Sequence, residues 1–79
     1  MDKKLIFKYD REGDILYIDK VPPYAEQETE ELGDDVIARL NPITSEIESL
    51  EVLFFSTRLL RSVLFTLPVT AELRMIGRI

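Results

Sequence analysis

Acidic side chains occupy every second position directly after residues 4–9. Asp10, Glu12 and Asp14 have the spacing of the first ligands of an EF-hand calcium loop. The rest of that loop is missing, because Ile15 replaces its glycine and Val21 replaces its bidentate glutamate. The pattern therefore favours a hairpin turn whose carboxylates face solvent.

A second acidic group is the densest in the chain. Residues 26–35 carry no base and six carboxylates: Glu26, Glu28, Glu30, Glu31, Asp34 and Asp35. Paired carboxylates could perform acid/base or divalent-metal chemistry, but one of them must be buried enough to hold its proton near neutral pH. Nothing apolar flanks residues 26–31, so we expect either a solvated face or a surface that binds a basic partner.

The chain has no histidine and no cysteine. It lacks the usual general base of neutral pH, the commonest metal ligand and any thiol nucleophile. Its serines have no base to activate them, and the widely separated Gly13, Gly33 and Gly77 form neither a P-loop nor a dinucleotide-binding fingerprint. We expect no catalytic residue, no metal and no cofactor.

Arginines near phenylalanines are the residues that could contact nucleic acid: Arg58, Arg61, Arg74 and Arg78. The net charge of −5 is the opposite of a basic nucleic-acid-binding surface. We expect no nucleic-acid partner. The arginines should instead cover apolar neighbours or pair with acids of a second subunit.

The spacing of apolar residues predicts an antiparallel sheet over residues 1–53. Residues 15–18 are apolar on both faces, which indicates a central strand, and Gly13 suits the hairpin loop before them. Residues 26–31 are polar on both faces and can form only an edge strand or a loop. The expected fold is α+β, an antiparallel β-meander of four to five strands, with further strands over 4–9, 36–40 and 46–53.

The periodicity changes after this sheet. Ser56 can cap a helix over 56–66, which should lie across one face of the sheet. Pro68 ends the helix, and alternation over 68–77 favours a short last strand, although residues 71–75 have helix propensity and 68–77 could instead be an extension. All 79 residues form a single expected domain, 1–79.

The helical region holds more large apolar side chains than one face of a short helix can bury. Oligomerisation is also the remaining source of stability for so short a chain without disulfides or metals. We therefore expect a homo-oligomer, with a two-fold dimer favoured. Its interface should contain Phe54, Phe55, Leu59, Leu60, Val63, Leu64, Phe65 and Leu67.

Charge and hydropathy indicate where the protein is located. No apolar run reaches the length of a membrane span, and the charged start is not followed by an apolar signal core. We expect a cytoplasmic protein without a membrane partner. Residues 1–51 carry a net charge of −8 and residues 52–79 carry +3, a division that favours a partner for each part.

Several runs resemble a known family. Residues 9–18 read YD-x-x-x-D-x-LYI, and 28–31, 35–41 and 46–53 continue the likeness. Together they resemble the small bacterial and archaeal family catalogued as domain of unknown function 2283, over about residues 5–57. The resemblance implies no activity, cofactor or catalytic residue, and it makes 58–79 a subgroup extension. Some members are suspected antitoxins, because their genes neighbour those of small RNase-like toxins.

These observations lead to two hypotheses of different class. The first is a non-enzymatic, homo-oligomeric protein-interaction module whose acidic face binds a basic protein such as a small toxin. The alternative is a small-ligand-binding protein or a carboxylate-dependent metal enzyme, with a subunit-boundary site using Asp10, Asp14, Glu28 or Tyr17. Convergent buried carboxylates beside a pocket would favour the alternative.

Overall fold

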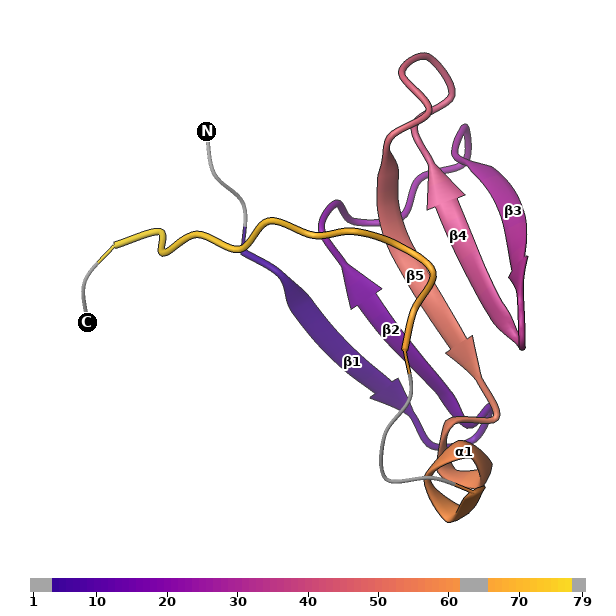
Figure 1. Ribbon diagram of the computed structural model, residues 1–79. Coiled ribbons are helices and arrows are strands. Elements are labelled where there is room, and N and C mark those ends of the chain that lie inside the picture. The colour runs from indigo at the N-terminus through magenta and orange to yellow at the C-terminus, as the bar shows by residue number, and fades with distance from the viewer. Residues whose placement is uncertain (1–3, 62–65, 78–79) are drawn as a thin grey trace.

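The computed structural model describes residues 4–61 and 66–77, in which an antiparallel sheet is followed by a short helix (Figure 1). The α+β class predicted from the sequence is confirmed. The elements are β1 (Ile6–Asp10), β2 (Ile15–Asp19), β3 (Glu28–Gly33), β4 (Val36–Leu40), β5 (Ile47–Leu53) and α1 (Phe55–Arg61).

The strand order is β1-β2-β5-β4-β3, and all neighbours are antiparallel. The prediction that residues 15–18 form a central strand is confirmed, and the acidic strand β3 lies at an edge. The order departs from a simple meander after β2. Pro22 and Pro23 lack the N–H groups that would continue a ladder, and β5 later pairs with both β2 and β4. β5 is therefore the middle strand.

The hydrophobic core occupies one face of the sheet. The register places Ile18, Leu50 and Ala38 in one row across β2, β5 and β4. Leu67 and Val69, which follow the helix, pack against this row. Among the described residues, the buried apolar side chains are Val36, Ala38, Leu50 and Val52. The core thus consists of one sheet face and a short strip of chain.

The C-terminal part differs from the sequence prediction. α1 does not lie across a face of the sheet but beyond the end of β5 (Figure 1). The sheet face is covered by Leu67 and Val69, which follow the helix. Helix is observed only through Arg61, and 62–65 lie outside the described residues. The strand expected over 68–77 is wrong, because this stretch pairs with no other strand. No helix in the described ranges is long and apolar enough to cross a membrane.

Two aspartates fasten α1 to the tips of two hairpins. Asp14, in the β1–β2 turn, accepts hydrogen bonds from the Ser56 N–H at 3.0 Å and the Ser56 hydroxyl at 2.7 Å. Asp34, in the β3–β4 turn, accepts one from Nη1 of Arg58 at 3.0 Å. The capping role predicted for Ser56 therefore belongs to Asp14, whose negative charge also suits a helix N-terminus.

The turn between β3 and β4 contains two residues in the left-handed region. Asp34 has a φ of 49° and Asp35 a φ of 61°, between the paired Gly33 and Val36. Two consecutive positive φ values are typical of a type I′ turn. Glycine adopts this conformation without the steric cost that a Cβ brings, so Asp35 carries backbone strain.

Replacing Asp35 with glycine gives the Asp-Gly pair that type I′ turns favour. We expect Asp35→Gly to raise the free energy of unfolding by up to about 1 kcal/mol in urea titrations, because relief of strain exceeds the added entropy of the unfolded chain. Asp34→Gly is the control, since it relieves similar strain but removes the hydrogen bond to Arg58. A less stable Asp35→Gly protein would contradict this account of the turn.

Candidate functional site

A β-bulge in the middle strand gives Glu48 an unusual position. Arg39 pairs with Ser49 but Leu40 pairs with Ile47, which leaves Glu48 as the extra residue of β5. The carbonyl oxygen of Glu48 accepts hydrogen bonds from the N–H groups of two successive residues after β2, at 2.9 and 3.1 Å. Because of the bulge, the Glu48 side chain departs from the regular alternation of side chains between the two faces of β5.

The Glu48 side chain is 9% exposed and is held by three polar groups of its own chain. Oε1 accepts hydrogen bonds from the Tyr24 hydroxyl at 2.6 Å and from Nε2 of Gln27 at 3.1 Å. Oε2 accepts one from Nδ2 of Asn41 at 3.2 Å. These contacts tie the β2–β3 connection and the residue after β4 to the middle strand.

The bond to Glu48 also changes the acidity of Tyr24. A phenol that donates to a carboxylate is favoured in its protonated form, and burial and the charges of Glu48 and Glu26 act in the same direction. Together these effects raise the pKa of Tyr24 to about 12. Tyr24 is thus a stable donor at neutral pH rather than a general base.

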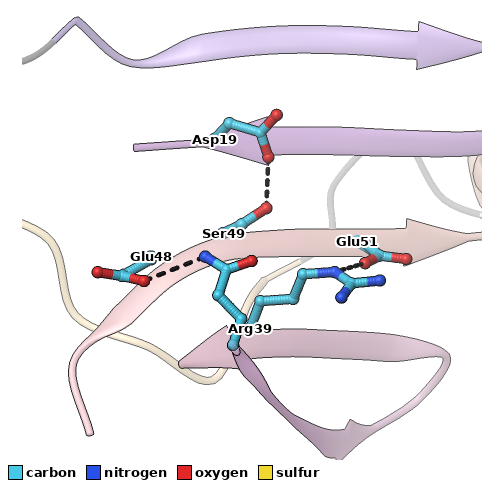
Figure 2. A network of polar contacts seen from close by, with 6 residues as sticks. Asp19, Arg39, Glu48, Ser49 and Glu51 are labelled. Atoms are coloured by element: carbon cyan, nitrogen blue, oxygen red, sulfur yellow. Dashed lines mark hydrogen bonds and ion pairs between the residues drawn. The ribbon is translucent and has the colours of Figure 1, made fainter. Parts of the chain in front are cut away.

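Figure 2 shows two further pairs along β5. The Ser49 hydroxyl donates to Asp19 on β2, and Nε of Arg39 on β4 donates to Glu51. Ser49 and Glu51 are both buried. Both buried glutamates of the strand therefore have partners on a neighbouring element, and this arrangement ties strands together rather than leaving a carboxylate open to substrate.

The four residues of the enzyme hypothesis are not joined by hydrogen bonds in the described chain. Asp10 accepts the Glu12 N–H within its own turn. Asp14 accepts the Tyr9 hydroxyl at 2.6 Å, which, with the bonds from Ser56, lowers the pKa of Asp14. Glu28 is exposed on β3, across the sheet from the strands that carry the others.

Tyr17 lies beneath the Lys8 ammonium, which is 5.3 Å from the centre of its ring. Burial raises the pKa of Tyr17, and the charges of Glu51 and Asp10 add to the increase. The described residues contain no group of three or more acidic, histidine or cysteine side chains placed to hold a metal ion.

An open groove of about 660 Å³ lies between the sheet and the chain after the helix. Lys20 and Glu46 are its charged lining residues, and Ile47 and residues 67–70 supply the rest. Glu48 is not among the lining residues. Glu48 and Glu51 therefore lie apart from this groove.

The predicted apolar interface is divided by the structure. Phe54, Leu59 and Leu60 are exposed, with Leu60 at 88%. Phe55 packs its ring 5.9 Å from that of Tyr9, and Leu67 packs on the core. The remaining members lie outside the described residues: Val63, Leu64 and Phe65.

Sequence reasoning missed a second exposed apolar surface, on the first strand. The side chains of Leu5, Ile6, Phe7 and Tyr9 are all exposed, with Phe7 at 61%. Among the described strands, β1 pairs with β2 alone. The alternation of residues 4–9 was visible in the sequence, but the position of the strand at an edge depends on the sheet order.

The six acids of residues 26–35 are exposed, as the sequence predicted: Glu26, Glu28, Glu30, Glu31, Asp34 and Asp35. Three of them line the edge strand β3. Asp34 also pairs with Arg58, which is 4% exposed. Arg58 thus binds an acid of its own chain. The same is true of Arg74, which pairs with Glu72.

Comparison with known protein families gives a match over most of the chain. The family model described as "Protein of unknown function (DUF2283)" matches residues 6–56, which include all five strands. No curated protein and no solved structure matches the chain.

The raised pKa of Tyr24 leads to a pH-dependent prediction. The unfolded phenol ionises near pH 10 and the folded one near pH 12. The stability that the hydrogen bond from Tyr24 to Glu48 contributes should therefore be complete below pH 10 and lost as the pH rises to about 12. The stability difference between the wild type and Tyr24→Phe should shrink over this range.

Tyrosinate absorbance provides the direct measurement. The wild type should show the ionisation of Tyr24 near pH 12, and this contribution should be missing in Tyr24→Phe but present in the control Tyr17→Phe. A Tyr24 hydroxyl that ionises near pH 10 in the folded protein would refute the hydrogen bond to Glu48.

Proposed function

The chain belongs to the DUF2283 family of unknown function, as its sequence resemblance predicted, and we propose that it acts as a non-enzymatic, homo-oligomeric protein-interaction module. A homodimer is the favoured assembly. Antitoxin-like neutralisation of a small basic protein is the specific form of the function that we favour.

The observation that carries this proposal is the excess of exposed surface. The chain exposes 6542 Å², about one-third above the roughly 4,900 Å² expected of a compact monomer of this mass. The radius of gyration is 13.5 Å, against about 11.6 Å expected for this length. So small a core on so large a surface supports an assembly that buries more of the chain.

The exposed apolar side chains support the same conclusion. Leu59 and Leu60 project from α1, and Phe7 projects from β1. Large apolar groups gathered on the surface of a small protein are typical of interaction sites. A second copy is the partner that stabilises the chain by covering them.

The charge distribution supports a basic second partner. β3 and the turn after it present exposed carboxylates at one edge of the sheet, far along the strand order from β1. An acidic surface of this kind can steer and cover the basic RNA-binding surface of a small toxin. Because the acidic and apolar edges are opposite, one copy could bind both partners at once.

The occupancy of the buried carboxylates favours this module over the enzyme alternative. Glu48 and Glu51 accept hydrogen bonds from their own chain, so both buried carboxylates already have structural partners within the sheet.

The mass in solution tests the assembly. We expect light scattering at micromolar concentration to give twice the 9.2 kDa chain mass. Urea unfolding should then be concentration-dependent, because dissociation accompanies unfolding. A compact 9.2 kDa particle whose stability is independent of concentration would refute the proposal.

Co-expression tests the antitoxin form. If the adjacent reading frame encodes a small basic protein that inhibits growth, we expect this chain to restore growth. A variant with Glu28, Glu30 and Glu31 changed to glutamine should restore it less well, and one with Glu12 changed to glutamine should act as the wild type does. Absence of such a neighbour, or equal rescue by the triple variant, would contradict this form.

A further inference from the structure

β1 presents an open backbone edge with a self-complementary side-chain pattern. It hydrogen-bonds to β2 on one side, and no described strand pairs with its other side (Figure 1). Its exposed residues alternate between apolar side chains on one face and charged or mixed side chains on the other. An exposed apolar strand edge is a ready template for a further strand.

We propose that β1 pairs in antiparallel fashion with β1 of a second copy, with Phe7 opposite the partner's Phe7. This proposal rests on the homo-oligomer proposed above and specifies its interface. Two five-stranded sheets then form one continuous sheet around a two-fold axis.

The side chains of residues 4–10 favour this register. Leu5 faces the partner's Tyr9, so that apolar groups meet on the face that carries the core. On the other face, Lys4 meets the partner's Asp10, which is an opposite-charge pair made twice by the symmetry.

The competing register centred on Lys8 is unfavourable. It places Lys8 opposite the partner's Lys8, and like charges directly opposite each other destabilise a strand pair. Pairing through β3 is unfavourable for a similar reason, since its glutamates would be brought against a second acidic strand.

The apolar face becomes continuous across the junction. Phe7 lies beside Ile18 and Tyr9 beside Leu16 in the β1–β2 register, so both belong to the core face of the sheet. Two copies of this row meet at the axis. The pairing therefore covers apolar side chains that are exposed in the single chain and extends the small core.

Charge exchange tests the register. We expect Lys4→Glu and Asp10→Lys each to raise the dimer dissociation constant about tenfold, because each places like charges opposite at two symmetric positions. An equimolar mixture of the two variants should dimerise as tightly as the wild type, since every opposed pair in the mixed dimer is again of opposite sign. This rescue separates an interface effect from an effect of Asp10 on its own turn.

Cross-linking supplies a second readout in a chain that has no cysteine. Opposed residues of an antiparallel pair have Cα atoms about 4.5–5.5 Å apart, within the range that a disulfide spans. Phe7→Cys should therefore give a disulfide-linked dimer on oxidation. Thr29→Cys, on the exposed edge strand β3, is the matched control and should not.

The outcomes separate this inference from the proposed function. A dimer that is insensitive to both charge variants, or that cross-links equally through Thr29→Cys, overturns β1 pairing and leaves the homo-oligomer standing. A monomer at all concentrations overturns both.

Discussion

The burial of two glutamates on the middle strand is the constraint on which the rest of the structure depends. Glu48 and Glu51 lie on β5, which has a strand on each side. A buried carboxylate without partners costs several kcal/mol, so its donors must be in place whenever the sheet is formed. Tyr24 and Asn41 anchor the β2–β3 connection and the end of β4, and Arg39 fixes β4 against β5. Strand order and polar network therefore form together.

Much of the fold was predictable because it depends on local patterns. Residues 15–18 are apolar on both faces, which favours a central strand, and the polar residues 26–31 can form only an edge strand or a loop. The strand order was not predictable, because it depends on which distant segment covers the second side of β2. The helix cap was missed for the same reason, because Asp14 is distant from Ser56 in the sequence but contacts it in space. The positive φ of the β1–β2 turn, expected at Gly13, is found at Asp14, whose φ is 56°.

The candidate surfaces were predictable in part. The exposure of the acids at 26–35 follows from their density, since no partner of opposite charge lies near them in the sequence. The interface prediction counted apolar residues in the helical region but could not tell which of them the chain itself covers. Phe55 and Leu67 turn inward, whereas Phe7 on the edge strand remains exposed. The partners of Glu48 could not be foreseen, because a bulge is what directs it toward them.

The two edges of the sheet differ in chemistry, and this difference limits how large an assembly can grow. In the proposed β1-paired dimer, the open strand edges among the described residues are two copies of β3, with Glu28, Glu30 and Glu31 along each. Two such edges repel each other, so a pair of chains has no remaining surface on which to extend the sheet. In that proposed dimer, the acidic strand that would attract a basic partner would also oppose growth of the sheet into fibres.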